Sequence, residues 1–252
     1  MGFGNILGPI SLQQKSLAAL PSAVGLRTGS AYEITDYGGN IATAVNGVWR
    51  FEFPFRTTWA GRPAVGLVPV GTELQVTDYA NQKWVSDGAN WRPAQGHAVL
   101  LNKWGSVTAP LAIVTGASDM QFSLPVSLIK AGLIIPDGVL TAIVWVRRTG
   151  ANGTAYVNTR LGTLNAYADA ALGNQSLSAT DALSARINVL ATPGLTSLSS
   201  LSGISPNGTG TSAVVSSSNF NLASDMNFSI YIRTANAADS FSLIGYQLIQ
   251  EV

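Results

Sequence analysis

Two neighbouring stretches of the chain are similar enough to be copies of one unit. Ile34-Thr35-Asp36-Tyr37 in the first corresponds to Val76-Thr77-Asp78-Tyr79 in the second, and Trp49-Arg50 corresponds to Trp91-Arg92. The turns between these motifs align when a slip of one residue is allowed, as is expected where repeats differ in their turns. A unit of this size cannot bury its own apolar face, so the copies are expected to pair with each other or with copies in other subunits.

Each copy has the pattern of a small β-meander, and the pattern is clearest in the second. Residues 74–77 alternate apolar and polar side chains, residues 78–82 have the composition of a turn, and a strand-like segment follows around Trp84. Residues 87–90 form another turn before Trp91. Alternation bounded by such turns predicts short antiparallel strands.

The composition favours an ordered protein that is covered by other protein. Charged residues make up 11% of the chain and hydrophobic residues 46%, with 26 glycines, so neutral side chains supply most of the polarity. Disordered chains combine low hydrophobicity with high net charge, and the surface of a solitary domain is usually richer in charge. The positive mean hydropathy therefore favours apolar surface covered by other protein, as in an obligate oligomer, and other causes remain open.

Charge, cysteine content and apolar run lengths exclude several classes of protein. The net charge is +1, and Arg147-Arg148 is the one adjacent basic pair, so the sequence lacks the clustered basic residues that bind nucleic acid. The absence of cysteine excludes disulfides and thiolate metal sites. The longest apolar stretches, residues 131–135 and 139–146, are too short to span a bilayer, and the N-terminus lacks the basic region of a signal peptide. We expect a soluble protein synthesised in a cytoplasm, with no membrane insertion.

Residues 1–22 are expected to form an N-terminal attachment arm. Glycines 2, 4 and 8 argue for an irregular start, and Ser11 has the character of a cap for a short helix over residues 12–20 that Pro21 ends. A helix of this length is not stable in isolation. Docking on a partner protein and packing on the chain's own domain both remain open.

Residues 23–105 are expected to form the tandem β-repeat module. Between the copies, Phe51, Phe53 and Phe55 would share one face of an extended segment, which Pro54 restricts to an edge or a strand end. This region also holds five of the six tryptophans. They are Trp49, Trp59, Trp84, Trp91 and Trp104. Clustered aromatic residues stack on sugars or other flat ligands in some proteins, but in small β modules they more often form the core, which is the interpretation we favour.

Residues 106–252 are expected to form a C-terminal β-sandwich head domain, with a jelly-roll-like arrangement as the leading candidate. Strands are predicted over residues 107–114, 120–126, 139–148, 154–161, 183–190, 212–215, 227–233 and 240–249. Asn152-Gly153 predicts a hairpin turn, and Thr192–Ser218 predicts a long loop. Residues 140–146 and 241–249 are apolar on both strand faces, so one extra face is expected to meet a neighbouring subunit. The chain as a whole is therefore predicted to be all-β.

The sequence contains no catalytic, cofactor-binding or metal-binding motif that can be assigned to named residues. His97 is the single histidine, and no G-x-S-x-G motif nominates a serine to act with it. Asp36 and Asp78 are equivalent turn residues, and hydrogen bonding within a turn accounts for them. Zinc, EF-hand and phosphate-binding motifs are missing. We predict that the protein is not an enzyme and binds no cofactor, although a glycosidase pair of carboxylates cannot be judged from spacing alone.

Several motifs resemble proteins of tailed-bacteriophage virions. The pattern V-S-D-G-A-N-W-R at Val85–Arg92, following V-T-D, resembles a small β motif of tail fibres, tail spikes and related appendages. The C-terminal part resembles the β-sandwich head domain of such proteins at Leu133–Gly138, Val146–Thr154, Arg160–Thr163 and Asn236–Leu243. Together these motifs cover most of residues 23–252, although the chain lacks the long shaft of typical fibres.

The resemblance implies a homotrimer in the virion, with its N-terminal part attached to other virion proteins and its C-terminal domain contacting a host surface glycan or protein. The function predicted on this basis is that of a structural virion protein, either a short trimeric tail fibre or a tail-tip or collar subunit involved in host attachment. Two alternatives remain: a capsid head fibre or decoration protein, and a carbohydrate-active depolymerase.

Overall fold

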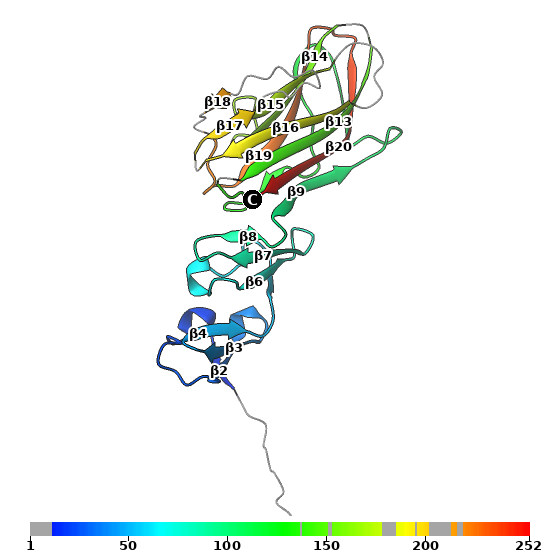
Figure 1. The fold of residues 1–252 in the computed structure, drawn as a ribbon. Helices are drawn as coiled ribbons and strands as arrows, with labels where there is room; N and C mark the ends of the chain where they lie inside the picture. Colours follow the sequence, from blue (N-terminus) through cyan, green and yellow to red (C-terminus); the bar gives the residue numbers. More distant parts are fainter. Residues whose placement is uncertain are drawn as a thin grey trace, which may run out of the picture. The chain divides into compact units, whose positions relative to one another are not determined.

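The computed structural model describes residues 12–136, 138–150, 153–177, 185–194, 196–201, 213–215 and 219–252. Over these residues the protein is all-β, as predicted, with three short 3-10 turns and no α-helix. The chain divides into two compact units, Met1–Ala94 and Gln95–Val252 (Figure 1). None of the described segments is a helix that is long and apolar enough to cross a membrane.

The first unit contains two four-stranded sheets of the same plan. In each sheet the first strand is parallel to the second, and the second, third and fourth form an antiparallel meander. The first sheet consists of β1 (Gln13–Lys15), β2 (Ala31–Ile34), β3 (Asn40–Val45) and β4 (Val48–Phe51). The second consists of β5 (Phe55–Thr57), β6 (Glu73–Val76), β7 (Gln82–Ser86) and β8 (Trp91–Pro93). The predicted pair of β-meanders is therefore present, with an additional parallel strand in each copy.

That additional strand moves the start of the first copy towards the N-terminus. The helix predicted over residues 12–20 does not form, because strand β1 pairs with β2 and is followed by a 3-10 turn, η1 (Leu17–Ala19). Leu17 is buried, so this segment belongs to the core of the first copy. The described part of the predicted arm is thus built into the repeat, and the rest of the arm, residues 1–11, lies outside the described residues.

The prediction that three phenylalanines share one face between the copies is wrong. The side chain of Asn40 donates to the carbonyl of Phe53 (2.7 Å) and accepts from its N–H (3.2 Å), which leaves the Phe53 ring 60% exposed. Phe55 begins the second copy and is fully buried. Its ring packs edge-on against Tyr37 (4.9 Å) and Phe51 (4.7 Å), so it joins the two copies.

Tryptophan forms the core of the second copy, as the favoured interpretation predicted for Trp59, Trp84 and Trp91, but the same interpretation is wrong for Trp104, which is 50% exposed. Trp59 and Trp84 are almost fully buried, with ring centroids 4.8 Å apart. At a constant offset of 42 residues, which also relates Asp36 to Asp78, their equivalents in the first copy are Leu17 and Ala42. The same site is therefore filled by two large rings in one copy and by small aliphatic side chains in the other.

The second unit is a β-sandwich of two sheets. The larger sheet has the order β10-β20-β13-β16-β17-β18, with β9 also paired to β20, and the smaller has the order β11-β19-β14-β15, with β12 paired to β19. The strands of the larger sheet are β9 (His97–Trp104), β10 (Ala112–Thr115), β13 (Val139–Thr149), β16 (Ala185–Pro193), β17 (Leu198–Leu201), β18 (Ala213–Val215) and β20 (Ser240–Glu251). Those of the smaller are β11 (Ser118–Gln121), β12 (Leu128–Ile129), β14 (Ala155–Gly162), β15 (Ala170–Leu177) and β19 (Met226–Thr234).

A long folded ribbon gives the sandwich its jelly-roll-like character. Strand β13 pairs with β20 in one sheet, and their chain neighbours β14 and β19 pair with each other in the second sheet. Both chains of the ribbon therefore cross between sheets at the same end. Leu140, Val144, Phe228 and Tyr246 are fully buried in the interior.

Two sequence boundaries in this unit differ from the prediction. Because β9 pairs with β20, residues 95–105 belong to the sandwich, and the boundary predicted at residue 105 lies at residues 94 and 95. The stretch 192–218, predicted as a long loop, contains the end of β16 and the strands β17 and β18. The remainder of that stretch and Asn152 of the predicted hairpin lie largely outside the described residues.

Candidate functional site

The equivalent aspartates of the two copies hold their own repeats together. The carboxylate of Asp36 accepts hydrogen bonds from the backbone N–H of Leu17 at 3.0 and 3.2 Å. In the second copy, Asp78 accepts from the backbone N–H of Trp59 at 2.9 Å. Each aspartate thus anchors the turn that follows the parallel first strand, which is a structural role.

The equivalent tryptophans also have the same contact in each copy. The indole N–H of Trp49 donates to the carbonyl of Pro21, and that of Trp91 donates to the carbonyl of Pro63, both at 3.0 Å. These pairs are related by the same offset of 42 residues as the aspartates. The one-residue slip expected from the sequence is present in the next turn, where the N–H of Leu26 donates to the carbonyl of Ala23 and the N–H of Leu67 donates to the carbonyl of Ala64, an offset of 41 residues.

The motifs that resemble virion head domains contain residues whose hydrogen bonds and ion pairs hold the strands of the sandwich together. Arg148, at the end of β13, forms a buried ion pair with Asp239 at 2.6 Å and donates to the carbonyl of Gly153 at 2.6 Å. Thr234, at the end of β19, donates to the same aspartate at 2.8 Å. This group links the two chains of the folded ribbon where they cross between sheets.

A second group of such hydrogen bonds lies in the turn between β14 and β15. The buried carboxylate of Asp169 accepts from the backbone N–H groups of Leu164 (3.1 Å) and Ala166 (3.0 Å), and the carbonyl of Asp169 accepts from Arg160. A Cβ atom at Gly162 would lie 2.4 Å from this carboxylate, so only glycine fits there. The Arg160–Thr163 motif is thus explained by packing.

Gln250 makes the third group of such hydrogen bonds. Its buried side chain donates to the carbonyl of Ile135 at 2.6 Å and accepts from the N–H of the same residue at 3.1 Å. The amide replaces the backbone partner that a neighbouring strand would supply. The Leu133–Gly138 motif is therefore also held for a structural reason.

His97 is exposed at the first position of β9, opposite Glu251. Among the described residues, no group of three or more His, Cys, Asp or Glu side chains could hold a metal ion.

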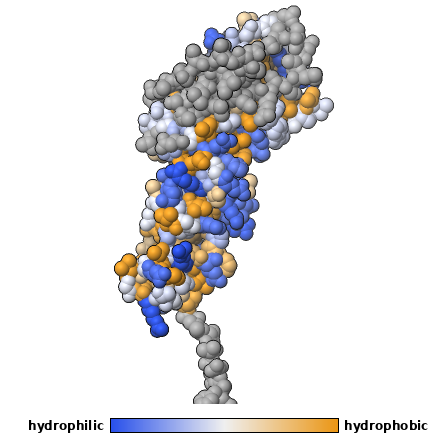
Figure 2. All heavy atoms as spheres, in the orientation of Figure 1, coloured by the Kyte–Doolittle hydropathy of each residue, from blue (hydrophilic) through white to orange (hydrophobic). Residues whose placement is uncertain are grey.

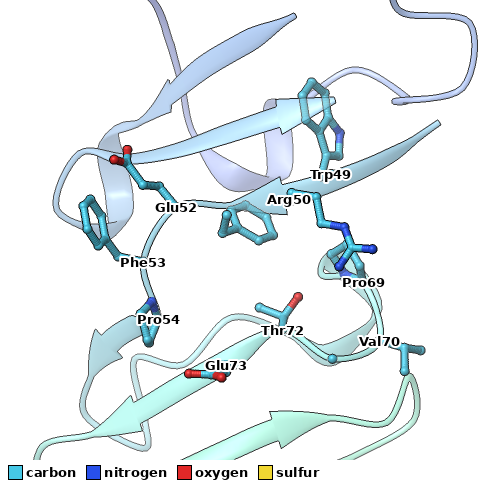
Figure 3. A pocket seen from close by; sticks show the side chains of 11 residues that line it. Trp49, Arg50, Glu52, Phe53, Pro54, Pro69, Val70, Thr72 and Glu73 are labelled. Atoms are coloured by element: carbon cyan, nitrogen blue, oxygen red, sulfur yellow. The ribbon is translucent and has the colours of Figure 1, made fainter. Parts of the chain in front are cut away.

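A polar groove lies between the two copies in the first unit (Figure 3). Its volume is about 270 Å³. One wall is formed by residues 49–54, at the end of the first copy, and the other by residues 69–73, which lead into β6. Trp49 and Arg50 lie towards one end, and Glu52 and Phe53 lie towards the other. Sequence reasoning did not identify this groove, because its two walls come from different copies.

Two carboxylates, those of Glu52 and Glu73, line the groove, and both residues are exposed.

The larger sheet of the sandwich has a second apolar face directed away from its core. Strand β13 alternates fully buried Leu140, Ala142 and Val144 with Ile143 and Trp145, which therefore lie on the opposite face. Hydrophobic residues reach the surface in both units, among hydrophilic ones (Figure 2).

Two tryptophans stack on this outer face. Trp104 of β9 and Trp145 of β13 pair with opposite sides of Gly245 in β20, and their ring centroids lie 4.1 Å apart. A Cβ at Gly245 would lie 2.6 Å from the Trp104 ring, so the glycine lets this ring lie across the strand. Trp104 remains 50% exposed, and Ile113 on the same face is 60% exposed.

No protein-family model and no curated protein matches the chain. Among solved structures, it is similar to a chain of the infectious bursal disease virus Gx strain, with 14% identity and a TM-score of 0.30. It is also similar to a chain of the subviral particle of the VP2 protein of that virus, with 12% identity and a TM-score of 0.23. Each alignment covers 84% of this chain but only 41% and 42% of the respective viral chains. Likeness at these TM-scores identifies neither a shared fold nor a shared function.

Proposed function

We propose that the protein is a structural virion protein of a tailed bacteriophage, a short trimeric tail fibre or a tail-tip or collar subunit involved in host attachment. The resemblance of its β-repeat and head-domain motifs to such appendages supports this proposal. The virion is its proposed location, with the N-terminal segment attached to other virion proteins and the sandwich facing the host.

The observation that carries the proposal is the apolar outer face of the larger sheet. Trp104 and Ile113 expose large hydrophobic side chains there, and the half-buried Trp145 contacts Trp104, in a chain with only 11% charged residues. Large hydrophobic side chains exposed on one face of a sheet are a recurrent mark of a protein interface. Copies of this chain packed through that face would bury it.

Attachment by such an assembly depends on valency. Several weak contacts made by linked copies raise the effective concentration of each remaining site, so the whole particle binds far more tightly than one chain does. This mechanism requires no catalysis by the protein.

Light scattering on the purified full-length protein across a dilution series tests the proposal. We expect a stable trimer, which Trp104→Glu dissociates because a carboxylate cannot be buried unpaired in an apolar interface. Leu164→Glu, at an exposed loop residue of the same unit, is the matched control and leaves the trimer intact. A monomer at every concentration would refute the proposed assembly.

A further inference from the structure

We propose that the outer face of the first repeat sheet packs against the same face of other copies of this chain, and that the second repeat sheet does not. The inference deepens the proposed function, on which it rests for self-association, by naming a contact surface in the first unit. This surface is separate from the outer face of the sandwich, so the two can be tested independently.

The two sheets of the first unit have the same pairing register, so their faces can be compared position by position. In each sheet, alternate residues of the strands are buried in the core of the copy, and the residues between them form the outer face. In the first sheet the middle of this face consists of Ala31, Ile41, Thr43, Val45 and Val48. At the offset of 42 residues, the same positions of the second sheet hold Glu73, Lys83, Val85, Asp87 and Asn90.

The two outer faces differ in chemistry although the two sheets have the same plan. The first sheet places four aliphatic side chains around Thr43, and one of them, Val48, is 43% exposed. The second places three charged side chains and one amide around Val85. The second copy therefore shows that this fold does not need aliphatic side chains on its outer face. An apolar strip that folding does not require indicates a surface covered by other protein.

Charges on either side of this apolar strip favour another copy of the chain as the partner. Glu33 lies on β2, towards the edge strand β1, where its carboxylate accepts a hydrogen bond from the side chain of Gln14 at 3.1 Å. Arg50 lies on β4, the opposite edge strand. Copies arranged in a ring, with this face turned towards a common axis, would bring the Glu33 side of one copy beside the Arg50 side of the next. Every junction then pairs opposite charges, and the aliphatic side chains are enclosed.

The equivalent arginine of the second sheet already has a partner within its own copy. Arg92 of β8 forms an ion pair with Asp87, in the turn after β7. In the first sheet Val45 stands at the position of this aspartate, so Arg50 cannot form the equivalent pair. The first copy thus has an aliphatic residue in place of the acid, and its arginine is exposed where a carboxylate of another chain can pair with it.

Cross-linking through introduced cysteines tests the inference, because the chain has no cysteine of its own. Thr43→Cys places a thiol at the centre of the outer face of the first sheet. Val85→Cys, the matched control, places one at the equivalent position of the second sheet, which is also half-buried. With the purified full-length protein and a short bismaleimide cross-linker, we expect covalently linked chains from Thr43→Cys and none from Val85→Cys.

Two further substitutions give the first sheet the side chains of the second. Ile41→Lys and Val45→Asp introduce the residues that the same fold holds at Lys83 and Asp87, so circular dichroism should show an unchanged fold. Combined with Thr43→Cys, each should abolish the cross-link, because a charge would be buried in the apolar strip. Lys83→Ile, the reverse change in the second sheet, should leave the Thr43→Cys cross-link intact.

The outcomes separate this inference from the proposed function. A protein that is trimeric by light scattering but gives no cross-link with Thr43→Cys overturns the inference and leaves the proposed function standing. Equal cross-linking at both cysteine positions, or cross-linking that survives Ile41→Lys and Val45→Asp, also overturns it. A Thr43→Cys cross-link in a trimer that Trp104→Glu leaves intact would instead refute the contact through the sandwich and support this one. A monomer without any cross-link refutes both.

Discussion

Removing Asp239 should destabilise the sandwich more than removing any exposed carboxylate. Asp239 is completely buried and pairs at 2.6 Å with Arg148, which is 4% exposed. In Asp239→Ala the guanidinium remains buried without its counter-ion, and breaking a buried pair from one side costs about 3–5 kcal/mol. For a domain of this size, 1 kcal/mol shifts the melting temperature by about 2–4 °C, so we expect a fall of roughly 6–20 °C.

The assay is thermal unfolding at fixed protein concentration, combined with hydrogen exchange measured on peptides from each unit. Exchange should accelerate in β13 and β20 and remain unchanged in β7, which belongs to the first unit. Asp119→Ala is the matched control, since its pair with Arg233 is exposed and has a separation of 3.9 Å, where such pairs contribute at most about 1 kcal/mol. The double variant Arg148→Met with Asp239→Leu should recover most of the loss. Equal costs for Asp239→Ala and Asp119→Ala would refute the reasoning.

Two further predictions concern the repeats. Asp78→Ala should cost the first unit about 1–3 kcal/mol in chemical denaturation, because the N–H of Trp59 loses a charged acceptor; Thr77→Ala is the control, and an equal effect of both would contradict the assigned role. Hydrogen bonds from the backbone of Asn90 and from the side chain of Arg92 lower the pKa of Asp87 to about 2. Its contribution to stability is therefore present above about pH 4 and lost as the pH falls towards 2, an effect that is small at this exposed site. Asp87→Asn should abolish it, and an NMR titration of the carboxyl group that gives an ordinary pKa would contradict the prediction.

The sequence predicted those parts of the repeats that depend on side-chain contacts. It did not predict the strands whose pairing depends on backbone hydrogen bonds alone. I-T-D-Y and V-T-D-Y revealed the unit because their aspartates have the same partner group in each copy. The first strands, Gln13–Lys15 and Phe55–Thr57, share no residue, since parallel pairing is made by backbone groups. Their equivalence therefore could not be seen before the pairing was known.

Strand β15 illustrates the same limit in the sandwich. Its sequence, A-A-L-G-N-Q-S-L, has no sustained alternation of apolar and polar residues, so it gave no strand signal. It forms because β14 offers a pairing edge, as the register of Ala155 with Leu177 shows. By contrast, β13, β19 and β20 were predicted to within a few residues, because their patterns of burial are strong.

The groove could not be predicted, because most of its lining is not part of the repeated pattern. Positions that are identical in the two copies, such as Asp36 and Asp78, make contacts within each copy, so substitution is restricted by folding. Most of the residues that line the groove are not restricted in this way, because they lie at the junction between the two copies and have no equivalent junction to match. Pro69 and Val70 accordingly replace Arg27 and Thr28 of the first copy. Divergence at the junction is the expected result when the two copies share only the contacts that fold them.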